Sequence, residues 1–143
     1  MGEFDTASIA SFVRTGALGP LAIGGAEHSV RALLGLPDTT GRGMGKTVIE
    51  QYAAGRLELT FSKARIVLIG LFPFRGSELG GLSVVDDLPT GVRESSQRFR
   101  QWLTQEGLQF EVIDPDPDSC VVRVRLRSIV AFQDGSLYTV QQT

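Results

Sequence analysis

The spacing of apolar positions along the chain alternates between a helical period and a strand period. Two short helices are expected first. The earlier helix begins at Asp5 or Thr6, either of which can cap it, and it stops at Gly16. The later helix ends at Gly35, because Pro37 prevents its continuation. Apolar residues three or four positions apart form the buried faces of both helices: Ile9, Phe12, Val13, Val30, Leu33 and Leu34.

After these helices the period changes to two, with apolar and polar residues alternating, which indicates strands. Three strands are expected, at 48–54, 56–61 and 65–72. The segment that follows, 75–91, is rich in glycine and in turn-forming residues. We interpret it as the connection to a second half of the chain.

The second half again has a helix followed by strands. Thr90 caps the expected helix and Gly107 ends it, and its buried face consists of Phe99, Trp102 and Leu103. Because the order of elements repeats, the chain is predicted to be one domain, 1–143, with two similar halves. The second-half strands are expected at 108–114, 120–127 and 129–141, the last folded as a hairpin around Asp134 and Gly135. The halves span about 1–75 and 83–143 and are joined by a Gly-rich linker, 76–82. The predicted fold class is α+β: an antiparallel sheet with helices backing one face and an open concave sheet face.

The segment LGPLAIGGAEHSVRALLGLPD carries a recognisable pattern: a glycine before a helix, an apolar residue followed by two leucines, then Gly-x-Pro. The residues that match are Gly24, Val30, Leu33, Leu34, Gly35 and Pro37. This segment resembles the opening of the helix-helix-three-strand repeat of the outer-membrane assembly lipoproteins and the beta-lactamase inhibitor proteins. The resemblance covers about 17–72. It implies a sheet backed by helices whose open face contacts other proteins, and it implies no enzymatic activity.

Composition and charge narrow the class of protein. Apolar residues make up 42% and charged residues 21% of the 143 positions, which is typical of a globular protein, and a net charge of −2 gives no general attraction to nucleic acid or anionic lipid. Cys120 is the only cysteine, so the chain contains no internal disulfide. Glu3 and Asp5 stand where a secretory signal carries positive charge. We expect a cytoplasmic protein with no cofactor and no bound metal.

The segment TTGRGMGKT, 39–47, ends like a phosphate-binding P-loop. A P-loop needs glycine where this chain has Thr40, and it connects a buried strand to a helix. Here an expected helix precedes the segment and β-branched residues follow it. We therefore interpret 39–47 as a surface loop that carries Arg42 and Lys46, and we predict that it does not bind nucleotide.

Several isolated polar residues invite a catalytic or metal-binding interpretation, and each has a structural alternative. The single histidine has no nucleophilic side chain near it in the sequence that it could activate. The cysteine stands at the start of an expected strand, where a small core residue is usual. Prolines interrupt the loop that carries three aspartates, so its spacing does not match that of a calcium-binding loop. The structural alternative is favoured for all of them: His28 beside Glu27, Cys120, the pair Asp86 and Asp87, and the loop residues Asp114, Asp116 and Asp118.

The most informative polar residues are three arginines in the expected strand 120–127. Strand alternation places Arg123, Arg125 and Arg127 on one face, opposite apolar residues. Such a row suits an acidic protein partner, because guanidinium groups pair with carboxylates. The alternatives are a solvated face paired with Glu111, Asp114 or Glu58, and a nucleic-acid surface. The nucleic-acid alternative is disfavoured, because no aromatic residues for base stacking are interleaved.

The apolar segment RIVLIGLFPF, 65–74, is predicted either to be covered on both faces or to meet a partner. The candidate binding residues are Arg123, Arg125, Arg127, Val67, Ile69, Phe72 and Phe74. The function expected from these patterns is a non-enzymatic bacterial protein-binding module, similar to an inhibitor or immunity protein. Two alternatives stay open: a domain that binds a small ligand on the concave sheet face, and an enzyme that uses His28 with Glu27.

Overall fold

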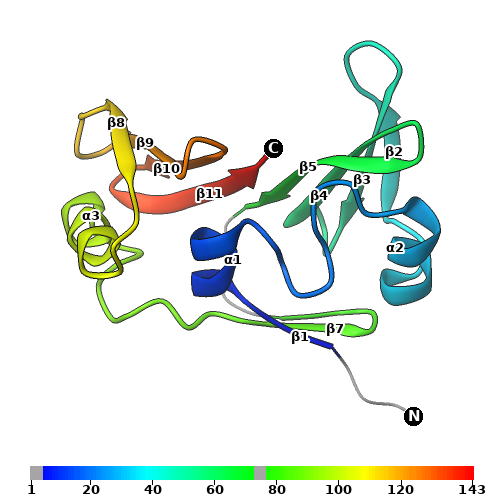
Figure 1. Cartoon of the computed structure of the whole chain (residues 1–143), viewed down its shortest axis with the longest axis horizontal. Helices are drawn as coiled ribbons and strands as arrows, with labels where there is room; N and C mark the ends of the chain where they lie inside the picture. Colours follow the sequence, from blue (N-terminus) through cyan, green and yellow to red (C-terminus); the bar gives the residue numbers. More distant parts are fainter. Residues whose placement is uncertain (1–4, 73–76) are drawn as a thin grey trace.

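The computed structural model describes residues 5–72 and 77–143, and within them the chain forms three helices and two sheets (Figure 1). The helices are α1 (Ile9–Thr15), α2 (Glu27–Leu34) and α3 (Ser96–Gln105). The large sheet has the strand order β2 (Thr39–Arg42), β3 (Thr47–Tyr52), β4 (Leu57–Ser62), β5 (Arg65–Leu71), β11 (Ser136–Gln142), β10 (Ser128–Gln133), β9 (Val121–Val124) and β8 (Phe110–Asp114). The small sheet has the order β1 (Asp5–Ser8), β7 (Leu82–Val85) and β6 (Ser77–Leu79).

The large sheet is antiparallel throughout and draws on both halves of the sequence. β2 to β5 form one up-and-down series, and β8 to β11 form another. The last strand of each series, β5 and β11, pair with each other in the middle of the sheet, with Leu71 opposite Val140. The predicted α+β class and the antiparallel sheet are confirmed.

The helices all lie on one face of the large sheet (Figure 1). α1 lies between the large sheet and the small sheet, while α2 and α3 flank it toward the two ends (Figure 1). The core between these layers is mainly apolar, and its largest fully buried side chains include Phe12, Phe61 and Phe99. The prediction that Phe99, Trp102 and Leu103 face the core is confirmed, since each is at most 5% exposed.

The starts of two helices differ from the predictions. Asp5 and Thr6 do not cap α1, because Asp5–Ser8 is a strand that pairs in parallel with β7. The N-cap of α1 is Ser8, whose hydroxyl accepts a hydrogen bond from the Ser11 NH. α3 likewise begins later than expected, with Ser95 in place of Thr90 as N-cap. Both chain stretches contain several residues able to cap, so the packing of the preceding segment decides which one does.

Two segments predicted to be irregular contain strands. Part of the expected connection, 75–91, forms β6 and β7, because Leu82 and Val84 bury their side chains and β7 gains a partner in β1. Part of the expected loop, 39–47, forms β2, which pairs with β3 as a hairpin. Within residues 5–72 and 77–143, no helix combines the length and the apolar character needed to span a membrane.

Candidate binding face

One face of the large sheet carries no helix or strand among the described residues, and we call it the open face (Figure 1). Strand alternation shows which side chains point there. In β4 the core side chains are buried, whereas Glu58, Thr60 and Ser62 alternate with them and are half-buried. The strand register then extends this assignment to the neighbouring strands.

The register aligns one open-face residue from each of the eight strands in a continuous row. In sheet order, the row consists of Thr39, Gln51, Glu58, Gly70, Gln141, Ile129, Arg123 and Glu111. Its two ends are polar, and its middle pairs Gly70 with Gln141, so side chains of neighbouring residues cover the glycine.

An apolar patch surrounds the centre of this row, and we call it the central patch. A Cβ built on Gly70 would lie 3.3 Å from the Phe72 ring and 3.7 Å from Leu68, so these side chains share the face with Gly70. β11 contributes the polar residues Gln141 and Thr139 to this face, and across β11 the cross-strand pairing adds apolar residues of β10 and β9. The central patch consists of Leu68, Gly70, Phe72, Ile129, Ala131 and Val121. All of them except the buried Gly70 are half-buried.

At both ends of the open-face row, neighbouring side chains form hydrogen bonds with each other. On the side of β2, the Thr39 hydroxyl donates to Gln51 Oε1 at 3.0 Å, and Gln51 Nε2 donates to Glu58 Oε2 at 3.0 Å. On the side of β8, Arg123 pairs with Glu111 at 3.0 Å, across neighbouring strands. The predicted cross-strand partner of Arg123 is therefore confirmed for Glu111, and the open face has an acidic group near each end.

The prediction of three arginines on one strand face is wrong. β9 ends at Val124, and the chain turns at Arg125 and Leu126, whose φ angles are 55° and 71°. Leu126 is 83% exposed and does not face the core. Of the three arginines, Arg123 alone lies on the open face. Apolar and polar residues go on alternating in the sequence after Val124, but the strand has already ended there and the chain turns.

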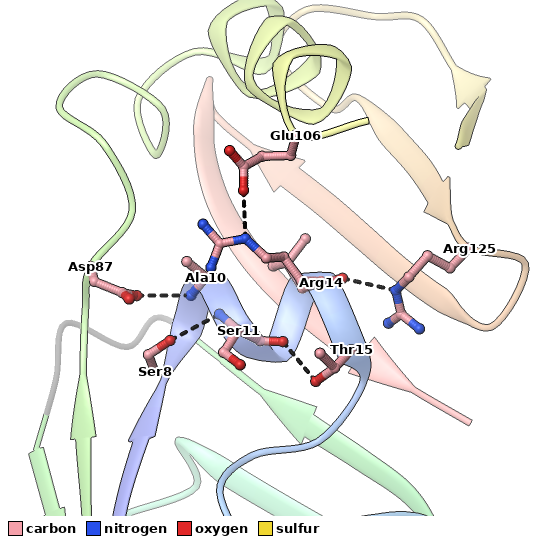
Figure 2. Close-up of polar contacts among 9 residues, drawn as sticks. Ser8, Ala10, Ser11, Arg14, Thr15, Asp87, Glu106 and Arg125 are labelled. Carbon is pink, nitrogen blue, oxygen red and sulfur yellow. Dashed lines mark hydrogen bonds and ion pairs between the residues drawn. The ribbon is translucent and has the colours of Figure 1, made fainter. Parts of the chain in front are cut away.

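Arg125 forms hydrogen bonds with other parts of the same chain, including the backbone of α1 (Figure 2). Its Nε donates to the Val13 carbonyl at 3.0 Å, at the end of α1, and an NH2 group donates to Ser128 Oγ and Gln142 Oε1. Burial lowers the pKa of the Arg125 guanidinium. Arg125 therefore connects α1 to β10 and β11, and its hydrogen bonds within the chain leave it unavailable for a partner.

The other predicted binding residues fall in different places. Ile69 is fully buried in the core, which contradicts its assignment to a binding surface. Val67 is the extra residue of a β-bulge in β5 and is 37% exposed, and Phe72 is half-buried against Tyr138, with their ring centroids 6.0 Å apart. Arg127 is exposed after the turn. Phe74 lies outside the described residues.

The isolated polar residues take mainly structural positions. Cys120 is fully buried, as the structural interpretation expected, and His28 is exposed on α2 beside a mainly apolar hollow of 410 Å³. Asp87 accepts a hydrogen bond from the Ala10 NH at the start of α1 (Figure 2), and Asp86 pairs with Arg93 at 3.2 Å. Between residues 5 and 72 and from 77 onward, no three His, Cys, Asp or Glu side chains are placed to hold a metal ion.

A charged cluster on the helix side of the sheet was not recognised in the sequence. Glu50 is 1% exposed and pairs with Arg31 of α2 at 2.5 Å, and it accepts a hydrogen bond from the Tyr52 hydroxyl at 3.1 Å. Burial raises the pKa of Tyr52 to about 12, and the hydrogen bond with Glu50 raises the pKa of Arg31. Arg31 Nε is buried without a hydrogen-bond partner. The signal in the sequence is a glutamate at an inward position of the strand 47–52.

Comparison with models of protein families, with curated proteins and with solved structures finds no match to this chain. The resemblance over 17–72 therefore stays a prediction, and what the open face can bind follows from its own side chains.

Proposed function

We propose that this chain is a non-enzymatic protein-binding module, of the inhibitor or immunity-protein kind, that docks a partner protein on the open face. The observation that carries the proposal is the central patch. A sheet face that serves only to meet water alternates polar residues outward, whereas this face has Leu68, Phe72 and Ile129 around Gln141 at its middle. An apolar centre with a polar rim is the usual arrangement of a protein interface.

The rim of the open face supports specificity. Glu58 and the pair Arg123–Glu111 lie on opposite sides of the central patch, so a partner needs complementary charges at two separated points. The resemblance of 17–72 to the helix-helix-three-strand repeat also supports the proposal, because it implies an open sheet face that contacts other proteins. The two halves each place a helix before an up-and-down series of strands, which supports the proposal that they are structural repeats.

We propose that the module acts in the cytoplasm. Its single cysteine is fully buried and forms no disulfide, which is compatible with a reducing compartment.

Photo-cross-linking in cells that naturally make this protein tests whether the open face is the docking site. A photoreactive phenylalanine analogue at Leu68 is expected to trap a protein. The same analogue at Val85, which is 45% exposed on β7 in the other sheet, is the matched control and is expected to trap none. With the purified partner, Leu68→Glu should weaken binding at least about tenfold, as charging the centre of an interface does, while Val85→Glu leaves affinity unchanged. Equal trapping at both positions, or equal affinity of both variants, would show that the open face is not the docking site.

A second candidate function is favoured by one observation. A shallow hollow of 250 Å³ lies at the β2 end of the large sheet, and Ile49, Gln51 and Glu58 contribute to its lining. A small polar ligand would fit there. Native mass spectrometry of the purified chain separates the two functions, since a bound small molecule adds mass that is lost on gentle activation, whereas a protein partner co-purifies as a second chain.

A further inference from the structure

Two hairpin turns lie next to each other at one end of the strands of the large sheet. The first joins β2 to β3, and Figure 1 shows it projecting from the sheet. The second joins β4 to β5 through residues 63 and 64. The strand register places Thr47 opposite Ser62, and Ser62 opposite Arg65, so the two turns are side by side. We call residues 42–46 and 63–65 the hairpin ends.

The hairpin ends concentrate positive charge that the described chain does not neutralise. Their basic residues are all exposed: Arg42, Lys46, Lys63 and Arg65. None of these four forms an ion pair with a carboxylate within residues 5–72 and 77–143. Glu27 lies beside the second turn, since its NH donates to the Ala64 carbonyl, and its carboxylate still pairs with none of them. Like charges on adjacent strands repel each other, so the folded chain gains no stability from gathering them here.

Exposed apolar side chains accompany these cations. Met44 stands in the first turn, between two basic residues, and is 91% exposed, more than any other large apolar side chain described. Val67, the extra residue of the β5 bulge, lies close to Arg65 in the chain and is 37% exposed. Ile23 is 39% exposed and precedes Gly24, whose carbonyl accepts a hydrogen bond from Arg65 Nη1 at 3.2 Å. The hairpin ends therefore present apolar groups among unpaired cations.

Negative charge gathers at the opposite end of the strands. Because Val140 of β11 lies opposite Leu71 of β5, the start of β11 extends past the end of β5 that is farthest from Arg65. The turn between β10 and β11 lies there, and Gly135 of that turn donates its NH to the Asp118 carbonyl. The exposed acidic residues at this end are Asp116, Asp118 and Asp134. The net charge of −2 thus conceals a large sheet with one positive and one negative end.

We propose that the hairpin ends bind the surface of an anionic lipid bilayer. Anionic lipids attract Lys and Arg side chains close to the membrane surface, and an exposed apolar side chain such as Met44 can enter the boundary between headgroups and acyl chains. The acidic end of the sheet then points away from the lipid. Nucleic acid also attracts cations, but its phosphate backbone offers Met44 no apolar contact, and the hairpin ends contain no aromatic residue for base stacking.

Binding through the hairpin ends leaves the open face available. The chain contacts the bilayer by its turns, so β2 to β5 rise from the lipid surface and the central patch faces sideways. A membrane-bound chain can therefore hold a protein on its open face at the same time. The membrane contact itself uses none of the residues of the central patch, and it is tested without any partner protein.

Co-sedimentation of the purified chain with lipid vesicles tests the proposal. Vesicles of phosphatidylcholine with about 30% phosphatidylserine should bind the chain at least about tenfold more tightly than vesicles of phosphatidylcholine alone. Lys46→Gln/Lys63→Gln should weaken binding to the anionic vesicles about thirtyfold, because each cation near such a surface strengthens binding about fivefold.

A matched variant removes the same charge elsewhere. Arg56 and Arg98 are exposed at the far end of β4 and on α3. At about 0.1 M salt, charges more than about 10 Å from the lipid are screened, so Arg56→Gln/Arg98→Gln should change the affinity by less than about twofold. Equal losses for the two double variants, or no preference for the anionic vesicles, would overturn the proposal.

The position of Met44 is measured separately. Cys120 is fully buried, so an introduced cysteine is the one that a label reaches in the folded protein. A polarity-sensitive fluorophore on Met44→Cys should shift its emission to shorter wavelength when anionic vesicles are added, whereas the same label on Val85→Cys of β7 should not. An unshifted emission at Met44→Cys would refute the contact with lipid. Binding of duplex DNA through Lys46 and Lys63, with the vesicles left unbound, would identify a nucleic-acid site and would also refute it.

Discussion

The cluster of Arg31, Glu50 and Tyr52 predicts an unequal response to removal of its members. Arg31→Met leaves the Glu50 carboxylate, whose side chain is 2% exposed, with the Tyr52 hydroxyl as its remaining partner. Removing one member of a buried ion pair costs about 3–5 kcal/mol, because a charge is left buried without compensation. The Arg31 side chain is 34% exposed, so water can approach the position that it leaves. We therefore expect a loss at the low end, about 3 kcal/mol.

A matched variant removes the buried polar groups together. In Glu50→Leu/Tyr52→Phe neither a carboxylate nor a hydroxyl is left without a partner, and the Arg31 guanidinium can turn toward solvent. Replacing both partners of a polar contact with apolar groups of similar shape is close to neutral, so the expected loss is about 1 kcal/mol or less. In this background Arg31→Met should add about 0.5 kcal/mol at most, because the charge that it would orphan is already gone.

Urea unfolding at neutral pH, followed by fluorescence of Trp102, measures both effects, since Trp102 is the only tryptophan and is buried against Phe99. Every variant must unfold in one transition for the comparison to hold. A loss below about 1 kcal/mol for Arg31→Met, or the same loss in both backgrounds, would show that the pair does not stabilise a buried charge.

Two further predictions concern buried polar groups. Because burial raises the pKa of Tyr52 from 10 to about 12, its contribution to stability is complete below pH 10 and is lost as the pH rises through about 12. Relative to Tyr52→Phe, the unmodified chain should lose about 2–3 kcal/mol over that interval, measured by urea unfolding at each pH, and parallel curves for the two proteins would contradict the assignment. Arg125→Gln should cost about 1.5–3 kcal/mol through its lost hydrogen bonds, whereas Arg127→Gln, at an exposed position, should change the unfolding free energy by less than about 0.5 kcal/mol. Equal effects of these two substitutions would contradict the structural role of Arg125.

The sequence predicts those elements whose apolar period is uninterrupted. The strands β3, β4 and β5 and the hairpin of β10 and β11 lie close to their expected positions, because alternation there coincides with burial. The strand β9 was predicted too long for a physical reason. Arg125 and Leu126 adopt positive φ angles without being glycine, so the sequence has no turn signal at the point where the strand ends.

Features that depend on pairing between distant segments were not predictable. β1 is a strand because β7 lies beside it in parallel, and nothing within Asp5–Ser8 distinguishes a strand from the start of a helix. The central patch likewise exists only through register, since its members come from β5, β10 and β9 and are brought together by β11. The residue types were visible in the sequence, whereas their adjacency was not.

The pairing of β5 with β11 in the middle of the large sheet has a consequence for how the chain folds as it is synthesised. Leu71 emerges from the ribosome long before Val140, its partner across the centre of the sheet. Until then the inner edge of β5 is an unpaired strand edge next to an exposed core. Contacts so distant in sequence slow folding, and unpaired edges promote aggregation in the meantime. A ribosome-bound nascent chain should therefore need protection by a chaperone until β11 is available to pair with β5.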